Sequence, residues 1–459
     1  MAAPVKKHDT IDVTIDSLAF GGSGVGRLNG FVVFVRRALP GDVVRAQVTK
    51  VKRGFAEATT LELLEPGPDR VEPRCAHAGS CGGCRFPELG YEAQVRAKEA
   101  QVRDAFERIA KLPDVLVEPM VPARSAYEYR NKLEYSFTQT DDGPALGFHR
   151  AGRWDEVLPI ERCHLTTELG NKVREAVNGW ARASGLSAYD QEAHEGFLRH
   201  LVFREGRNTG QVLTMLVTAP GELQDADGLV AALTAIPEVR SIHWAVNDRP
   251  AEVTNLPSEL LWGEEAIEEE LCGLRFRVRP NAFMQTNTEM AAVLYETVVE
   301  FAALTGDETV YDLYAGTGTI GLVLAPHALT VWGVELSEES VACAIENATL
   351  NGLVNAAYYA GDVAASLEEL VPRSGAPDLI VVDPPRAGLS KKALRGVAEL
   401  GAKRIVYVSC NPTTLAPNAK VLLEEHGYAI ERVRPVDMFP HTPHIECVTS
   451  FVRQEPESS

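Results

Sequence analysis

The stretch Val310-Tyr311-Asp312-Leu313-Tyr314-Ala315-Gly316-Thr317-Gly318-Thr319-Ile320-Gly321 decides the fold of the C-terminal part of this chain. It begins as a short apolar run and ends in three glycines spaced Gly-x-Gly-x-x-Gly. That order is typical of a buried strand, a tight turn and the start of a helix. Glycines at these positions let the backbone approach a ligand closely. The spacing fits a nicotinamide dinucleotide as well as S-adenosylmethionine, and it also fits a tight turn that binds nothing.

Strands and helices alternate along the whole C-terminal segment around this stretch. This alternation predicts an α/β domain over residues 275–459, built on a doubly wound, Rossmann-like parallel sheet. The expected strands cover residues 309–313, 330–335, 356–360, 379–382 and 404–408. The expected helices cover residues 289–304, 320–325, 338–351, 391–399 and 415–426.

Acidic residues stand where the expected strands end. Glu335 closes the second strand, Asp362 follows the third, and Asp383 follows the fourth. Ligands of open α/β sheets bind at the carboxyl ends of the strands, so we expect these acids to face one ligand. A carboxylate there accepts hydrogen bonds from ribose hydroxyls or from an adenine amino group. The layout favours a methyl-donor pocket, because none of the acids offers a way to hold a nicotinamide ring.

A thiol and a further acid complete the expected site. Cys410 follows the apolar run 404–408 and precedes an Asn-Pro turn, so the sequence predicts a nucleophile on a loop at the strand exit. Glu446 lies between a loop rich in Pro and His and the strand-like run 448–452. It is a candidate general base. A solvated carboxylate at a strand end is the plainer interpretation of the same residue.

The N-terminal part predicts two further domains. Residues 8–64 contain short alternating runs divided by Gly-rich turns, which predicts an OB-like β-barrel over residues 1–65. Residues 1–64 carry nine Lys and Arg against six Asp and Glu, which favours an oligonucleotide-binding module, with a solvated basic barrel as the alternative. Residues 66–274 alternate strand-like and helical runs without a parallel rhythm, so we expect an α+β middle domain there.

Four cysteines form a metal-binding pattern in the middle domain. Cys75, Cys81 and Cys84 lie close together on a Gly-rich backbone, and Cys163 is a distant fourth. Four thiolates complete either the tetrahedral shell of zinc or the shell of an iron–sulfur cluster, and the spacing leaves both open. Three other thiols lie in apolar or helical contexts and are expected in the core. These three are Cys272, Cys343 and Cys447.

Length and composition are those of an ordinary globular protein with roughly two to four domains. The 459 residues are 45% apolar and 24% charged. No apolar stretch reaches the roughly 18 residues of a membrane span, and no apolar leader follows the N-terminus, so we expect a cytoplasmic protein without a membrane partner. The net charge of −19 argues against nucleic acid as a partner, yet the basic N-terminal end is compatible with a local nucleic-acid surface.

Five segments together resemble the uracil-5-methyltransferase family that modifies RNA, and the resemblance covers essentially the whole chain. The Ser-Cys-Asn-Pro and Asp-Pro-Pro-Arg motifs are highly specific, whereas the glycines are not. The barrel is similar to a TRAM domain, an RNA-binding module. The four cysteines are similar to the [4Fe-4S] site of the branch that acts on ribosomal RNA. The five segments are Phe283-x-Gln285-x-Asn287, Asp312–Thr319, Asp383–Gly388, Ser409–Pro412 and His444–Glu446.

The resemblance implies a role for each candidate residue. Cys410 would add to C6 of a uracil, and Glu446 would remove the proton from C5. The four cysteines Cys75, Cys81, Cys84 and Cys163 would hold the [4Fe-4S] cluster. Thr319 stands where some ribosomal-branch relatives have Asn. S-adenosylmethionine would be held by Gln285, Tyr314, Gly316, Gly318, Thr319, Glu335, Asp362 and Asp383.

The leading hypothesis is therefore a monomeric enzyme that methylates C5 of a specific uridine in 23S ribosomal RNA. A transfer-RNA substrate is the alternative within the family; the barrel and the cysteines argue against it, because simpler tRNA-acting relatives lack both. A non-catalytic RNA-binding protein that uses its cluster as an iron or redox sensor is a rival from another class. A nicotinamide-dependent oxidoreductase rests on the glycines alone.

Overall fold

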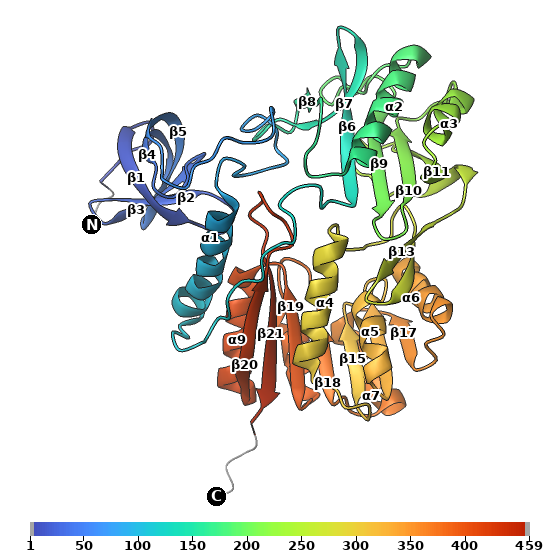
Figure 1. The fold of residues 1–459 in the computed structure, drawn as a ribbon. Coiled ribbons are helices and arrows are strands. Elements are labelled where there is room, and N and C mark those ends of the chain that lie inside the picture. The colour runs from blue at the N-terminus through green and yellow to red at the C-terminus, as the bar shows by residue number, and fades with distance from the viewer. Residues whose placement is uncertain (1–3, 455–459) are drawn as a thin grey trace, which may run out of the picture.

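Three parts follow one another along the chain in the computed structural model, which describes residues 4–454 apart from the side chains of residues 368 and 369. A small barrel lies at the left of Figure 1, a middle sheet at the upper right, and the C-terminal sheet below them. This order matches the three predicted domains in kind: an OB-like barrel, an α+β part and an α/β part.

The N-terminal part is a closed five-stranded barrel in the order β1-β2-β3-β5-β4, as the alternating runs predict. Inward residues are small or β-branched, such as Val33, Val44 and Ala58, none of which is exposed. This alternation places polar residues on the outer surface. The strands are β1 (Thr10–Leu18), β2 (Gly24–Leu28), β3 (Phe31–Arg36), β4 (Val43–Val51) and β5 (Phe55–Glu65).

The middle part is a seven-stranded sheet in the order β12-β11-β10-β9-β6-β7-β8, antiparallel except for the pair β10 and β11. Two helices, α2 (Glu168–Ser184) and α3 (Ala226–Thr234), pack on it through one shared apolar cluster. The strands are β6 (Lys132–Thr140), β7 (Gly143–His149), β8 (Val157–Pro159), β9 (Leu198–Gly206), β10 (Gln211–Thr218), β11 (Val239–Val246) and β12 (Ser258–Gly263). The hairpin of β13 (Ile267–Leu271) and β14 (Leu274–Val278) then leads to the C-terminal part, and the expected domain boundary at 274/275 falls within it.

The C-terminal sheet has the order β17-β16-β15-β18-β19-β21-β20. The first five strands of that order are parallel, as predicted, whereas β21 and β20 are antiparallel to their neighbours. The strands are β15 (Thr309–Leu313), β16 (Thr330–Glu335), β17 (Ala356–Ala360), β18 (Leu379–Val382), β19 (Arg404–Ser409), β20 (Tyr428–Val436) and β21 (Glu446–Arg453).

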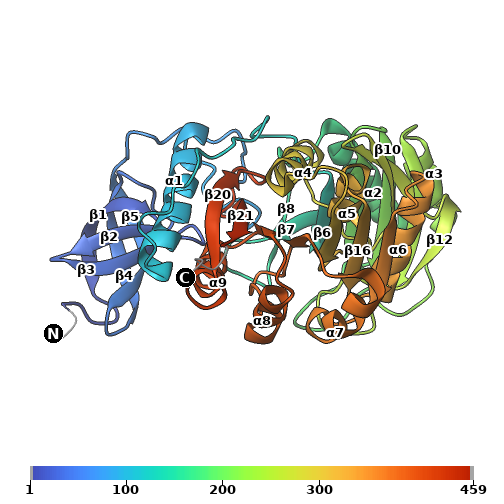
Figure 2. The ribbon, with the colours of Figure 1, turned by 90° about the horizontal axis from the view of Figure 1, so that it is seen from below.

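Helices cover both faces of this sheet (Figure 2). Helices α4, α5 and α6 share an apolar cluster on one face, and α7, α8 and α9 share another on the opposite face. Every residue of β18 is buried for this reason, which explains its continuous apolar sequence. None of the helices described in residues 4–454 is long and apolar enough to cross a membrane. The helices are α4 (Thr288–Ala302), α5 (Thr319–Leu324), α6 (Glu338–Leu350), α7 (Val363–Ser374), α8 (Lys391–Glu399) and α9 (Pro412–His426), with a short 3-10 turn, η2 (Ala325–His327), after α5.

Two of these elements were not expected from the sequence. The helix α7 has its buried residues Val363, Leu367 and Leu370 at helical spacing, but Pro372 in its last turn obscures the pattern. The strand β20 also contains a proline, Pro435, along with several charged residues. It lies at the edge of the sheet, where a strand tolerates both.

An N-terminal segment completes the C-terminal domain. The helix α1 (Tyr91–Asp104) continues as a π-helix, η1 (Ala105–Ala110), whose residue Phe106 lies in the same apolar cluster as α9. The chain then runs beside the outer edge of β20, where the amides of Glu118 and Val121 donate to the carbonyls of Val433 and Pro435. The edge of the sheet is therefore covered by a segment that precedes the middle sheet in sequence, although it falls within the expected middle domain, 66–274.

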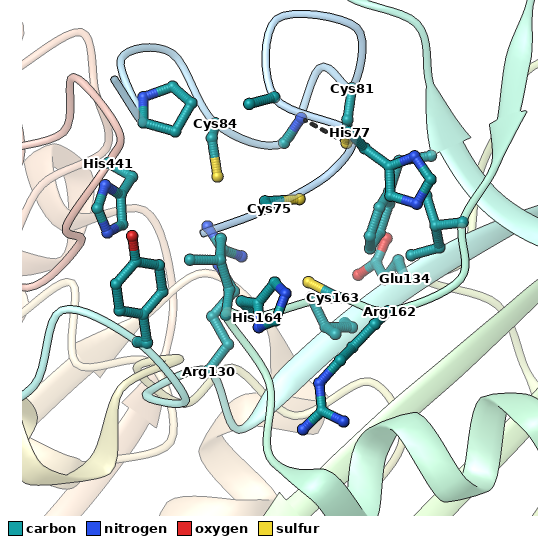
Figure 3. A pocket seen from close by; sticks show the side chains of 18 of the residues that line it. Cys75, His77, Cys81, Cys84, Arg130, Glu134, Arg162, Cys163, His164 and His441 are labelled. Carbon is teal, nitrogen blue, oxygen red and sulfur yellow. Dashed lines mark hydrogen bonds between the residues drawn. The ribbon is translucent and has the colours of Figure 1, made fainter. Parts of the chain in front are cut away.

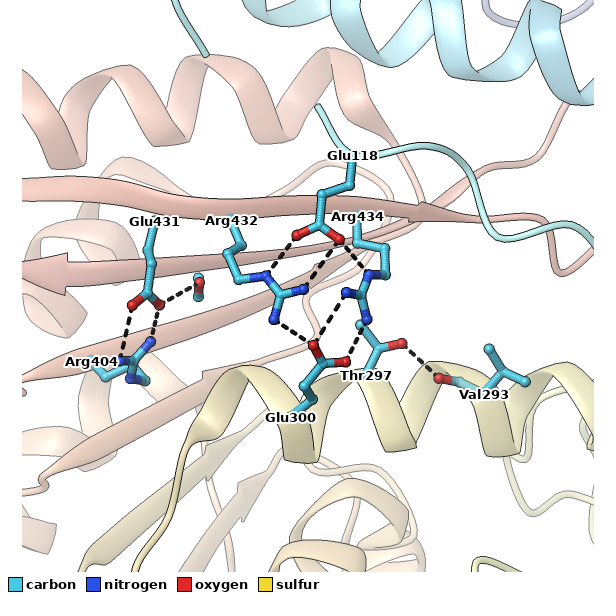
Figure 4. Close-up of polar contacts among 9 residues, drawn as sticks. Glu118, Val293, Thr297, Glu300, Arg404, Glu431, Arg432 and Arg434 are labelled. Carbon is cyan, nitrogen blue, oxygen red and sulfur yellow. Dashed lines mark hydrogen bonds and ion pairs between the residues drawn. The ribbon is translucent and has the colours of Figure 1, made fainter. Parts of the chain in front are cut away.

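An ion-pair network holds this edge segment in place (Figure 4). The carboxylate of Glu118 accepts from the Nε atoms of Arg432 and Arg434, each at 2.6 Å. Both arginines also pair with Glu300 on α4, and these two partners lower the pKa of Glu300 to about 2. The network thus joins α4, β20 and the segment that covers the sheet edge.

Candidate active site at the strand tips

The glycine-rich turn after β15 has the backbone that the sequence predicts. Gly316 and Gly318 have φ values of 56° and 80°, in the left-handed region that favours glycine. A Cβ atom on Gly318 would lie 2.8 Å from the Cβ of Ala344 and 2.9 Å from the ring of Tyr358, so a side chain does not fit there. Tyr314 also has a positive φ, of 64°, which is uncommon for a residue with a side chain and often marks functional sites.

Asp312, inside β15, belongs to this turn although it was not among the expected site residues. Its Oδ2 accepts from the amide of Gly321 at 2.9 Å, and a Cβ on Gly321 would lie only 2.6 Å from that oxygen. Its other oxygen, Oδ1, is buried and has no hydrogen-bond partner. Burial raises the pKa of Asp312 to about 7. A buried carboxylate oxygen without a partner suits a ligand that donates a hydrogen bond. The sequence signal for Asp312 was a charged residue inside an apolar strand.

The two acids predicted to follow the second and third strands occupy different surroundings. Glu335 ends β16, and its carboxylate accepts from the amides of Gly316 at 3.0 Å and Ser337 at 2.9 Å. Asp362 is exposed and forms the N-cap of α7, where it accepts from the amide of Ala365 at 3.1 Å. Glu335 therefore lies against the glycine turn, while Asp362 stands at the neighbouring strand tip.

The segment before α4 lies against the same turn. The hydroxyl of Thr317 donates to the carbonyl of Phe283 at 2.9 Å, and Gln285 is buried two residues further on. Thr319 is the first residue of α5 and is buried, with its hydroxyl 3.5 Å from the hydroxyl of Tyr295. The structure thus places both sides of the predicted donor pocket next to the glycine turn.

Cys410 and Glu446 meet at the same edge of the sheet. The antiparallel pair β19 and β21 ends with Ser409 opposite Cys447, so the next residues, Cys410 and Glu446, face each other at the strand tips. Asp383 follows the neighbouring strand β18, whose last residue is paired with β19. A thiol, a buried acid and a second acid are therefore adjacent at this edge.

The electrostatics of this corner disfavour negative charge. Burial, Glu446 and Asp383 raise the pKa of the Cys410 thiol to about 11, and Arg386 opposes them. Burial and Asp383 hold the pKa of Glu446 well above its usual range. Burial and Asp312 raise the pKa of Asp383 to about 7. A cationic ligand at this edge would favour the ionised form of each of these groups.

Asn411 fixes the geometry of the two loops that carry these residues. Its Nδ2 donates to the carbonyl of Arg386 at 3.1 Å, which joins the loop after β19 to the loop after β18. Its Oδ1 accepts from the amide of Thr413 at 3.0 Å and caps α9. One side chain therefore holds the loop of Cys410 to the loop of Asp383.

The four predicted metal ligands line one cavity of about 400 Å³ beside the middle sheet (Figure 3). Burial raises the pKa of Cys84, and nearby Cys163, Cys81 and Cys75 add to the shift because neighbouring thiolates repel. The same cavity is also lined by Tyr127, Arg130, His164 and His441. Cys163 therefore lies at the same cavity as the other three cysteines, although it is distant from them in sequence.

The arrangement of these thiols bears on the choice of metal. Within residues 4–454 no group of three or more His, Cys, Asp or Glu side chains is arranged to hold a single metal ion. Zinc needs its four sulfurs at about 2.3 Å around one ion. A [4Fe-4S] cluster instead takes one thiolate on each iron, so its ligands surround a larger volume. Both groups take four thiolates, and four thiols line this cavity.

The fold and the glycine turn define the class first: the C-terminal part is a Rossmann-like α/β domain with a glycine turn at the carboxyl end of β15. Residues 263–454 match the family model described as tRNA (Uracil-5-)-methyltransferase, and residues 4–61 match the TRAM domain. A protein of Halalkalibacterium halodurans named "Uncharacterized RNA methyltransferase" is 40% identical over 448 residues, 97% of each chain. One of the same name from Bacillus cereus is 37% identical over 457 residues, 99% of each chain. The chain belongs to the RNA uracil-5-methyltransferase family.

A solved structure extends the likeness to the whole fold. The tRNA (uracil-54, C5)-methyltransferase of Pyrococcus abyssi, in complex with S-adenosyl-L-homocysteine, superposes with a TM-score of 0.78 at 28% identity. The match covers 96% of this chain and all of that one. A protein named for a tRNA substrate is therefore similar over nearly the full length. Because the match includes most of the barrel, the barrel does not argue against a tRNA substrate.

Proposed function

We propose that this enzyme uses S-adenosylmethionine to methylate C5 of a uridine in RNA through a covalent bond to Cys410. The observation that carries the proposal is the juxtaposition of Cys410 with Glu446 at the strand tips, beside Asp383 and the glycine turn. C5 of uracil is too weak a nucleophile to take a methyl group directly. Addition of a thiolate to C6 turns C5 into an enolate carbon, which supplies the missing reactivity.

The chain's own residues account for the remaining steps. After the methyl group has been transferred to C5, the carboxylate of Glu446 takes the proton from C5. The electrons of that bond re-form the C5–C6 double bond, the C6–sulfur bond breaks, and Cys410 returns as a thiolate. A carboxylate with a raised pKa is a stronger base than an ordinary one, which suits this task.

The cofactor supplies a methyl group on a positively charged sulfonium. The site fits such a ligand because Asp312 has a free buried oxygen and Asp383 stands next to the nucleophile. We propose that Gln285, Tyr314, Gly316, Gly318, Thr319, Glu335, Asp362 and Asp383 hold it.

The charge argument predicts how ligands change the thiol. We expect the pKa of Cys410 to fall by about one to three units when the methyl donor binds, because a nearby cation favours the thiolate. The rate of alkylation of Cys410 by iodoacetamide, followed against pH by peptide mass mapping, measures this pKa. S-adenosylhomocysteine, which lacks the sulfonium charge, is the matched control and should leave the pKa high. Equal shifts with both ligands would contradict the electrostatic explanation.

The substrate that we propose is 23S ribosomal RNA. Support comes from the four cysteines around one cavity, which resemble the site of the ribosomal-RNA branch. A specific observation favours the rival, since the Pyrococcus protein that matches nearly the whole chain is named for a tRNA. A TRAM barrel suits either RNA. We retain a monomer in the cytoplasm as a prediction.

Methylation of separate RNAs distinguishes the two substrates. Purified enzyme is incubated with transcripts of 23S RNA fragments or with bulk tRNA from a strain that lacks this protein, and 5-methyluridine is located by mass mapping. We expect methylation of a 23S fragment and none of tRNA. The reverse result would move the enzyme to the tRNA branch and leave its chemistry intact. Failure of the protein to bind S-adenosylmethionine would instead favour a non-catalytic RNA-binding role.

We also propose that Cys75, Cys81, Cys84 and Cys163 hold a [4Fe-4S] cluster that braces the middle part. Protein purified without oxygen should be brown and contain about four irons per chain. Cys84→Ser should lose most of the iron, whereas Cys272→Ser, which alters a half-buried thiol outside the cavity, should retain it. Colourless wild-type protein with stoichiometric zinc would contradict the proposal.

A further inference from the structure

Buried side chains hold each of five consecutive residues shortly before the candidate base. The segment is 437–441, which leads from β20 through residues 442–445 to Glu446 at the start of β21. Asn287 donates to the carbonyl of Met438 at 2.8 Å, and the hydroxyl of Tyr129 donates to that of Pro440 at 3.0 Å. A surface loop has few such contacts, so this segment is fixed by the parts around it.

The helix α1 makes the strongest of these contacts. Lys98 donates from Nζ to Asp437 at 2.7 Å and to the carbonyl of Phe439 at 3.0 Å, and the Lys98 and Asp437 side chains are 1% and 0% exposed. Tyr91 adds a hydrogen bond to the other oxygen of Asp437 at 2.9 Å. Ion pairs buried this deeply contribute little net stability, because desolvation offsets the attraction. The ion pair between Lys98 and Asp437 is therefore better explained by the position in which it holds segment 437–441.

His441 is the last residue of the segment and has a strained backbone. Its φ of 63° lies in the left-handed region, and its amide donates to Oε1 of Gln94 at 2.8 Å. Its carbonyl accepts from the amide of Arg85 at 2.8 Å, next to Cys84. The strained backbone of His441 persists because α1 and the loop that carries Cys84 and Arg85 hold this residue from both sides.

Three sites thus converge on one segment. Asn287 caps α4 two residues after Gln285, Arg85 follows Cys84, and the chain continues from the segment through residues 442–445 to Glu446. We infer that Lys98 and Gln94 on α1 are positioning residues that hold segment 437–445 so that Glu446 reaches the C5 proton. This inference rests on the proposed function, in which Glu446 removes that proton after methyl transfer.

The test separates proton removal from the earlier steps. The double variant Lys98→Met with Asp437→Asn removes the charges without leaving one buried alone, and Gln94→Leu removes the anchor of His441. We expect turnover on uridine RNA to fall about 10- to 100-fold with an unchanged KM for RNA, since small displacements of a catalytic group have effects of this size. The isotope effect from deuterium at C5 should rise, and covalent Cys410–RNA adduct should accumulate. Adduct formation with 5-fluorouridine RNA, which needs no proton removal, should keep its wild-type rate.

The control is Arg96→Met, on the same helix as Lys98 and Gln94. This change breaks an exposed ion pair with Asp69 and should change none of these readings. If adduct formation falls in step with turnover, or if both variants turn over normally, the positioning role is wrong. If the double variant does not fold, Gln94→Leu decides by the same readings. Wild-type enzyme that forms no adduct at all would overturn the proposed function itself, which is a distinct outcome.

Discussion

The Cys410→Ala enzyme should form no covalent adduct with 5-fluorouridine RNA and should lose methyl transfer by a factor of about 10⁴ or more. The sulfur is the atom that makes C5 reactive, and the other thiol at these strand tips, Cys447, is fully buried in β21 opposite Ser409. The adduct with wild-type enzyme is stable because fluorine on C5 does not leave as a proton does. Denaturing gels of enzyme, RNA and methyl donor show the adduct directly.

The matched control is Cys272→Ala. Cys272 is half-buried like Cys410, but it lies in the β13–β14 hairpin, and its sulfur has only a weak contact to α4. The variant should form adduct at the wild-type rate. An adduct formed by Cys410→Ala would refute the covalent mechanism, and mapping of the crosslinked peptide would then identify the true nucleophile.

The second large effect is expected for Glu446→Gln. The amide keeps the shape of the side chain but cannot take a proton, so turnover on uridine RNA should fall about 10²- to 10⁴-fold while methyl transfer and adduct formation persist. Ordinary uridine RNA should therefore accumulate on Cys410 as a methylated adduct, which wild-type enzyme releases. Rapid release of product by this variant would exclude Glu446 as the base.

The same variant should change stability in an unusual direction. The pKa of Glu446 is held above its unfolded value, so the folded state binds the proton more tightly. Its contribution to stability is then present at low pH and is lost as pH rises from about 4.5 through the raised pKa. Glu446→Gln should remove this loss and melt at or above the wild-type temperature at neutral pH.

The control for the trapping of RNA by Glu446→Gln is Glu269→Gln. It alters another buried acid, which accepts from Thr288 at 2.8 Å, and it should produce no trapped RNA.

The sequence predicts the strand tips well because each is a local signal. An apolar run followed by a polar residue places Glu335, Asp383 and Cys410 at one edge, whatever the rest of the fold does. That Glu446 faces Cys410 depends on the antiparallel return of β21, which follows the unexpected strand β20. Local patterns do not encode such a pairing.

The contacts that hold the base segment were beyond sequence reasoning for a different reason. Lys98 in α1 reads as an ordinary exposed lysine of an amphipathic helix, and its partner Asp437 lies at the far end of the chain. Asp312 could have been found, since an acid within an apolar strand is a local signal. Residues separated by several hundred positions meet only through the tertiary fold.

The edge segment beside β20 has a consequence for how the protein folds during its synthesis on the ribosome. Val121 pairs with Val436, and η1 packs with α9, so the last domain to be synthesised needs residues that emerged long before it. All strands of the middle sheet, which is built from residues 132–263, are synthesised before the C-terminal sheet begins. The nascent chain must therefore keep α1 and its extension unburied while the sheet that will receive them is still being translated.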